Sequence, residues 1–296
     1  MGTTAHLVAV GADPELLDDL EARLRDLERR WTRLTDTSEL ARLNATAGQV
    51  TVLEPDTFRL VASAVEGWHR TGGNYDPTVA HAMRANGYAA SFESITPPSS
   101  VATLPAPGCD DIVLMPGSST VVLPSGVELD FGGIGKGFAA DLLCEEALAQ
   151  MRADGLCVNL GGDVRVMGTP PSDDGWTVEL TPLPGPDGAP VQIALSAGAV
   201  CTSRVDKRAW AGPAGEHGEL LHHVLDPRTG APTRTDVTAI SVIAGSATVA
   251  ELVTKAAIVA GSTEAGRFVD DFGAAAMLLT TTGDTMTFGN FEDFIR

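Results

Sequence analysis

Short apolar runs separated by turn-forming residues most constrain the fold of this sequence. Such apolar runs lie at residues 127–131, 156–160, 164–167, 176–180, 191–195, 238–244 and 275–280, and clusters of Pro, Gly and Asp separate those at 164–167, 176–180 and 191–195. Runs of this length between turn residues are typical of β-strands. Residues 112–115 and 120–123 predict a hairpin, and residues 181–190 predict a loop. The chain is therefore expected to contain much sheet.

Helical patterns lie between these runs. Asp13-Pro14-Glu15 precedes leucines and a tryptophan at helical spacing over residues 16–34, which predicts a capped amphipathic helix. Further helices are predicted over residues 55–70, 138–152 and 247–259. Residues 89–108, rich in Ser, Pro and Ala, predict a surface excursion. Strands and helices mix without strict alternation, so the fold class is α+β.

Composition excludes several classes of protein. With 39 acidic and 20 basic residues the net charge is −19, which argues against a nucleic-acid partner. The sequence has no apolar run near the ~20 residues of a membrane helix, so no transmembrane segment is expected. Four cysteines without a CxxC pair predict buried free thiols. The chain as given predicts a cytoplasmic protein, or an exported or membrane-anchored one if a longer native N-terminus carries a signal.

Residues 128–141 contain the sequence most suggestive of ligand binding. Four glycines stand between a predicted strand and a predicted helix, and Lys136 lies among them. Glycines let the backbone approach a ligand, the helix N-terminus offers free N–H groups, and the lysine adds a positive charge, so the segment suits a phosphate. A plain glycine-rich turn, with Asp130 only capping it, is the alternative.

Together with other segments, this stretch resembles the ApbE family of flavin transferases. The matching segments are Met1-Gly2-Thr3, Gly73-Asn74-Tyr75-Asp76-Pro77-Thr78-Val79, Asn159-Leu160-Gly161-Gly162-Asp163 and His223-Val224-Leu225-Asp226-Pro227-Arg228-Thr229-Gly230. The resemblance implies a single ApbE-like domain over residues 1–296, with two lobes of mixed or antiparallel sheet and helices around a cleft. It also implies an FAD:protein FMN transferase, which moves FMN from FAD to a Thr or Ser hydroxyl of an acceptor protein and releases AMP.

The resemblance further implies a set of site residues. Those expected to bind the cofactor are Met1, Tyr75, Asp76, Thr78, Asp130, Lys136, Leu225 and Thr254. The backbone oxygen of Gly133 and the side chain of Glu251 are the expected Mg²⁺ ligands, and His223, Lys136 and Lys255 are the expected catalytic residues. Two residue types leave alternatives open: Tyr75 can stack on a flat ring or simply pack, and His223 can act on the acceptor hydroxyl or serve as scaffold.

The helix over residues 250–261 departs from the family pattern. It resembles the family's A-D-x-x-x-T-A, but Glu251 replaces the metal-binding Asp and Lys255 replaces the metal-binding Thr. Both project from one helical face. Glu251 is still an oxygen ligand for Mg²⁺, whereas an ammonium cannot coordinate a cation and repels it. The hypothesis is that Lys255, paired to Glu251, takes the place of the metal; the alternative is a surface ion pair.

A second departure is Cys201-Thr202-Ser203-Arg204, where the family usually has T-S-G. Arg204 can narrow the pocket or reach toward a phosphate. The replacement of the metal ligands by Glu251 and Lys255 keeps a second function open beside the transferase. This is an ApbE-like protein that binds FAD or a related flavin nucleotide with little transferase activity, because the metal ligands are replaced.

Overall fold

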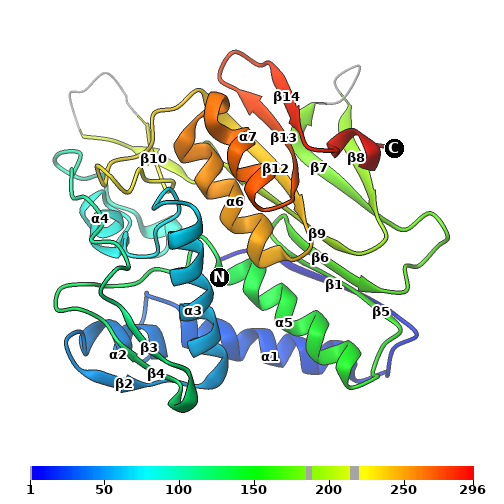
Figure 1. Cartoon of the computed structure of the whole chain (residues 1–296), viewed down its shortest axis with the longest axis horizontal. Helices are drawn as coiled ribbons and strands as arrows, with labels where there is room; N and C mark the ends of the chain where they lie inside the picture. Colours follow the sequence, from blue (N-terminus) through cyan, green and yellow to red (C-terminus); the bar gives the residue numbers. More distant parts are fainter. Residues whose placement is uncertain (1, 185–188, 214–219) are drawn as a thin grey trace. The chain divides into compact units, whose positions relative to one another are not determined.

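The computed structural model describes residues 2–184, 189–213 and 220–296 (Figure 1). Met1 lies outside the described residues. The chain forms two compact units: Met1–Gly2, Glu28–Gly133 and Val205–Arg234 make the first, and Thr3–Leu27, Ile134–Arg204 and Thr235–Arg296 make the second. The single domain over residues 1–296 stays a prediction.

A seven-stranded antiparallel sheet forms the frame of the second unit, in the order β1-β5-β6-β9-β12-β13-β14. Its strands are β1 (Ala5–Val10), β5 (Gly155–Leu160), β6 (Asp163–Gly168), β9 (Gly198–Arg204), β12 (Val237–Ala244), β13 (Ala275–Thr280) and β14 (Thr285–Phe288). The strands β7 (Trp176–Pro184) and β8 (Pro190–Leu195) pair as a separate ribbon. These pairings bear out the α+β class.

Both faces of the central strands are covered. Helix α5 (Gly135–Ala149) contacts β5 and β6, and α6 (Ala247–Ala260) contacts β9 and β12 (Figure 1). Helix α7 (Ser262–Asp271) contacts β13, and the turn η4 (Phe291–Phe294) contacts β8, β13 and β14. Side chains alternate along a strand, so Ala239 and Ile243 of β12 pack into a core shared with the β7–β8 ribbon. A central strand buried on both faces holds the adjoining helices in fixed positions.

The first unit is built from one long helix, α3 (Pro55–Arg70), and shorter elements. The shorter elements are α2 (Glu39–Ala45), β2 (Val50–Val52), α4 (Ala80–Ala85), η1 (Phe92–Ser94), β3 (Val113–Met115), η2 (Pro116–Ser118), β4 (Thr120–Val122), β10 (Ala209–Ala211) and β11 (Leu220–His222). Strands β2, β4 and β3 form one small sheet, and β10 pairs with β11. Helix α1 (Leu16–Trp31) belongs to the second unit up to Leu27 and to the first from Glu28.

Most of the predicted elements are confirmed, including the helix over 55–70, the hairpin and the free, mostly buried cysteines. The helix predicted to reach residue 34 ends at Trp31, and β7 extends into the predicted loop as far as Pro184. Residues 185–188 of that loop lie outside the described residues. In the part of the chain that the structure describes, no helix is long and apolar enough to cross a membrane. The cellular location stays a prediction.

Two predicted boundaries near the glycine-rich segment are wrong. Residues 127–131 form no strand, because the amide side chain of Asn44 binds both the N–H and the C=O of Leu129, at 2.8 and 2.9 Å. The following helix spans Gly135–Ala149 instead of residues 138–152. It begins earlier because the carboxylate of Glu251 accepts a hydrogen bond from the N–H of Gly137 at 2.8 Å and so caps the first turn.

Candidate functional site

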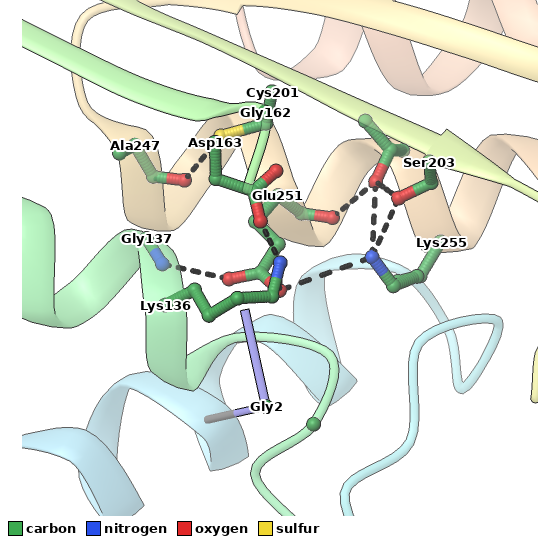
Figure 2. Close-up of polar contacts among 12 residues, drawn as sticks. Gly2, Lys136, Gly137, Gly162, Asp163, Cys201, Ser203, Ala247, Glu251 and Lys255 are labelled. Carbon is green, nitrogen blue, oxygen red and sulfur yellow. Dashed lines mark hydrogen bonds and ion pairs between the residues drawn. The ribbon is translucent and has the colours of Figure 1, made fainter. Parts of the chain in front are cut away.

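Glu251 lies at the centre of a group of charged residues in the second unit (Figure 2). Its side chain is fully buried on α6. Oε2 accepts the Gly137 N–H, and Oε1 lies 3.4 Å from Nζ of Lys136 and 3.9 Å from Nζ of Lys255. A buried carboxylate is costly unless paired, so the two ammonium groups offset the cost of burying Glu251.

Lys136 joins Glu251 to a second carboxylate. It is the second residue of α5, and its ammonium donates a hydrogen bond to Oδ2 of Asp163, the first residue of β6. The Asp163 side chain is almost completely buried. Lys136, Asp163, Glu251 and Lys255, called the charge cluster below, therefore contain two carboxylates and two ammonium groups.

Lys255 is held by hydroxyl groups as well as by Glu251. Its Nζ donates to Oγ of Ser203 on β9 at 2.6 Å. Oγ1 of Thr254 lies 2.6 Å from that Ser203 oxygen and donates to the backbone oxygen of Glu251 at 2.6 Å. Thr254 is itself buried, so its hydroxyl orients Ser203, and Ser203 in turn fixes the Lys255 ammonium.

The start of α6 is fixed by two capping side chains. Ser246 accepts from the N–H of Val249 at 3.3 Å, and the carboxylate of Asp141 on α5 accepts from the N–H groups of Ala247 and Thr248 at 2.9 and 2.8 Å. Burial raises the pKa of Asp141, while these hydrogen bonds and the Arg165 guanidinium at 3.0 Å oppose the rise. Because Asp141 and Gly137 both bond α6, α5 and α6 place Lys136 and Glu251 together.

A thiol borders the charge cluster. Sγ of Cys201 donates to the backbone oxygen of Ala247 at 3.4 Å. Burial raises the pKa of this thiol far above its ordinary value, and the Glu251 carboxylate raises it further. Cys201 therefore stays protonated and is not a nucleophile.

The charge cluster does not fit a divalent cation. Mg²⁺ takes several oxygen ligands. The oxygen Oε1 of Glu251 instead lies near two ammonium groups, which repel a cation. No group of three His, Cys, Asp or Glu side chains suited to a metal occurs among the residues that the structure describes. The other predicted ligand, Gly133, is assigned to the first unit, and its part in a metal site stays a prediction.

In the first unit, Asp76 and Thr78 are engaged with each other. Oδ1 of Asp76 accepts from the N–H and hydroxyl of Thr78 at 2.7 and 2.6 Å, and Oδ2 accepts from Nε1 of Trp68 at 2.9 Å. The Thr78 hydroxyl also accepts from the N–H of Gly108 at 3.0 Å. Burial raises the pKa of Asp76, and its hydrogen bonds oppose the rise. These side chains stabilise the loop that follows Tyr75. The Tyr75 side chain is itself buried.

Asp130 caps the glycine-rich turn and pairs with an arginine. Its Oδ1 accepts from the N–H of Gly132 at 2.6 Å, and its Oδ2 lies 2.7 Å from Nε of Arg33. The guanidinium of Arg33 also lies over the ring of Tyr88, 4.7 Å from the centroid. Asp130 therefore does cap the glycine-rich turn, as the alternative interpretation predicted, and Arg33 holds its carboxylate in place.

The segment from His223 to Gly230 forms a tight turn. Asp226 binds its neighbour Arg228 through both carboxylate oxygens at 2.9 Å, and the N–H of Gly230 donates to the Asp226 backbone oxygen at 2.7 Å. Gly230 adopts a φ of +71°, which favours glycine. Leu225 is buried in a core with Tyr88 and Trp210, and His223 is half-buried.

Comparison with known proteins gives the family. The ApbE family model matches residues 1–278. The chain belongs to the ApbE family. Two curated relatives are named FAD:protein FMN transferase: one from Treponema pallidum (strain Nichols) is 28% identical over 263 residues, covering 83% of this chain and 71% of its own. The other, from Haemophilus influenzae (strain ATCC 51907 / DSM 11121 / KW20 / Rd), is 26% identical over 298 residues, covering 95% of this chain and 85% of its own.

Solved structures share the ApbE fold. The ApbE protein of Thermotoga maritima superposes with a TM-score of 0.85 at 24% identity, covering 100% of this chain and 96% of its own. The flavinyl transferase ApbE of Pseudomonas stutzeri superposes with a TM-score of 0.83 at 22% identity, covering 99% of this chain and 94% of its own. The predicted fold is therefore confirmed.

Of the predicted site residues, the structure brings together Lys136, Glu251, Thr254 and Lys255. The first unit holds Gly133, Tyr75, Asp76, Thr78, Asp130, His223 and Leu225, and their roles toward FAD stay predictions. Sequence reasoning missed three residues in these networks: Asp163, Ser203 and Arg33. Asp163 stands in a segment that matches the family and Ser203 in one that departs from it, so their positions in those segments were the available signal.

Proposed function

We propose that this ApbE-family chain is an FAD:protein FMN transferase, which moves FMN from FAD to a Thr or Ser hydroxyl of an acceptor protein and releases AMP. Membership of the family and the shared name of the two relatives support the overall reaction. The choice of Thr or Ser as acceptor rests on the sequence resemblance.

One observation in the charge cluster carries the proposal. The side chains of Lys136 and Lys255 are 21% and 14% exposed, whereas those of Glu251 and Asp163 are 0% and 1% exposed. The exposed part of the cluster therefore belongs to the two lysine side chains, whereas both carboxylates are buried. Lys136 also stands in the first turn of α5, where the helix dipole favours an anion. This arrangement suits a diphosphate.

The reaction is a phosphoryl-group substitution. The acceptor hydroxyl oxygen attacks the phosphorus on the FMN side of the FAD diphosphate, and a new O–P bond forms. The bond from that phosphorus to the bridging oxygen breaks, the bridging oxygen leaves with AMP, and the hydroxyl proton passes to a base. Negative charge grows on the leaving phosphate, so fixed positive groups accelerate this step.

We assign these tasks to residues of the chain. Lys136 and Lys255 bind the diphosphate and stabilise the charge on its oxygens. The half-buried imidazole of His223 accepts the hydroxyl proton, because imidazole is a common general base at neutral pH. Tyr75 and Leu225 are assigned to the flavin side of the substrate.

Mass spectrometry after incubation with FAD and a Thr-bearing acceptor peptide tests the proposal. We expect an FMN-sized addition to the peptide and an equal amount of AMP. A matched peptide with Val in place of Thr controls for the acceptor hydroxyl, and FMN in place of FAD controls for the leaving group; neither should give product. Tight FAD binding without transfer to several Thr and Ser peptides would contradict the proposal and favour a flavin-nucleotide-binding protein.

A further inference from the structure

We propose that the ammonium of Lys255 replaces a divalent cation at Glu251, so that the charge cluster binds an anionic diphosphate without metal. The exclusion of metal is a property of the cluster itself. The statement that the diphosphate is that of FAD rests on the proposed function.

The surroundings of Glu251 are the first observation. Oε2 is bound to the N–H of Gly137, which leaves Oε1 as the oxygen that a cation would approach. Oε1 already has Lys136 Nζ at 3.4 Å and Lys255 Nζ at 3.9 Å. A Mg²⁺ ion bound at its usual distance of about 2.1 Å would come close to both ammonium groups. An ammonium has no lone pair to offer the metal and repels it.

Lys255 is held in this position, which is the second observation. Ser203 accepts its hydrogen bond at 2.6 Å, and Thr254 orients Ser203 at 2.6 Å. Glu251 is fully buried and Lys255 is largely so. The two residues are therefore not an exposed ion pair whose lysine can swing aside to admit a cation.

The charge balance is the third observation. Asp163 and Glu251 contribute two negative charges, and Lys136 and Lys255 contribute two positive charges, so the four residues are neutral together. A divalent cation on Oε1 of Glu251 would add two positive charges directly beside these two ammonium groups. Removal of the Lys255 charge would leave a net charge of −1 and would make a cation favourable.

Mn²⁺ titration followed by electron paramagnetic resonance tests the exclusion, with Mn²⁺ as the probe and no flavin present. The wild-type protein is expected to leave Mn²⁺ in its free hydrated form. Lys255→Thr removes the ammonium and adds a hydroxyl ligand, so its Mn²⁺ affinity is expected to rise roughly tenfold or more. Lys207→Thr makes the same change at the exposed third lysine and is expected to behave as wild type. If Lys255→Thr does not fold, Lys255→Gln serves, because its amide is also a neutral oxygen ligand.

FAD binding, followed by flavin fluorescence, tests whether the charge cluster binds a diphosphate without metal. The wild-type dissociation constant is expected to be the same in EDTA and in MgCl₂, whereas Lys255→Thr is expected to bind FAD more weakly in EDTA and to recover in MgCl₂.

Stoichiometric Mn²⁺ binding by the wild type that Glu251→Gln abolishes would overturn the proposal, as would equal Mn²⁺ affinities for Lys255→Thr and wild type. If Lys207→Thr raised the Mn²⁺ affinity as much as Lys255→Thr does, the proposal would also be overturned, since net charge alone would then explain the effect. Absence of any FAD binding would contradict the proposed function and leave the Mn²⁺ result to decide the metal exclusion.

Discussion

The ammonium of Lys136 lies 3.4 Å from Oε1 of Glu251, and the same ammonium donates to Asp163. One side chain thus pairs with two buried carboxylates, which come from α6 and β6. Because Lys136 itself stands on α5, this contact ties two helices to the sheet at the point where the site is proposed.

Lys136→Met is expected to destabilise the protein. Met keeps most of the volume but leaves two buried carboxylates with only the Lys255 ammonium. Breaking a buried pair on one side costs 3–5 kcal/mol when it is fully buried. Lys136 is 21% exposed, so we expect a loss of about 2 kcal/mol in the free energy of unfolding by urea.

Lys207→Met is the control for this change. It removes the same charge from an exposed position, where substitutions usually change stability by less than about 0.5 kcal/mol. Equal stabilities for the two variants would show that Lys136 does not neutralise the buried carboxylates.

The relation of sequence to structure differs between local and distant contacts. The helix over 55–70 was predictable because Pro55 suits its first turn and Thr71-Gly72-Gly73 ends it. The pairing of Glu251 with Lys255 was predictable because four residues make about one helical turn. Asp163 was not, because the sheet register brings it to Lys136 from 27 residues away.

Other elements escaped prediction for reasons of composition and context. The central strand β9 reads Gly-Ala-Val-Cys-Thr-Ser-Arg, mostly small residues that give no apolar run. Residues 127–131 have the pattern of a strand, but Asn44 takes the hydrogen bonds that a neighbouring strand would make. A side chain from elsewhere in the chain thus replaced a strand, and no local pattern reveals this.

Arg33→Met is expected to loosen the glycine-rich turn. It leaves the Asp130 carboxylate, which is largely buried, without its guanidinium partner at 2.7 Å. We expect a loss of about 2 kcal/mol in unfolding free energy, measured in urea, with Arg33→Lys losing less because it keeps the charge. Equal losses for Met and Lys would show that the fork geometry and packing on Tyr88 matter rather than the charge.

His222 is expected to make the protein less stable in mild acid. Its Nε2 lies 3.0 Å from the backbone oxygen of Thr233, and burial lowers its pKa below the ordinary value of 6.5. As the pH falls through 6.5, His222 binds a proton in the unfolded chain but not in the folded protein, so the free energy of unfolding decreases. Melting temperatures at pH 7.5 and 5.5 measure this difference.

His222→Gln tests the source of that pH dependence. Gln keeps a donor for Thr233 but does not titrate, so its melting temperature should fall less between the two pH values than that of the wild type. An unchanged fall would assign the acid sensitivity to other groups.

His223→Gln tests the proposed base. Removal of a general base typically lowers a rate by 10²–10⁴-fold, so we expect transfer to the acceptor peptide to fall at least about 100-fold. FAD affinity and melting temperature should stay near wild type. His222→Gln, one residue earlier, is the matched control and should transfer FMN at a rate close to wild type. A fall of similar size in both variants would point to a structural role for this segment.

Gly137→Ala tests how closely α5 approaches α6. A Cβ at residue 137 would lie 2.4 Å from the backbone oxygen of Ala247, a contact that backbone atoms cannot relieve cheaply. We expect a loss of roughly 1–3 kcal/mol in unfolding free energy, because the helices must separate and the bond from Gly137 to Glu251 lengthens. Gly245→Ala is the control, since a Cβ there meets nothing within 4 Å. If α5 and α6 position the ammonium groups, Gly137→Ala should also weaken FAD binding, while Gly245→Ala should leave it unchanged. Weaker FAD binding without loss of stability would show that the spacing of the two helices matters more for the site than for the fold.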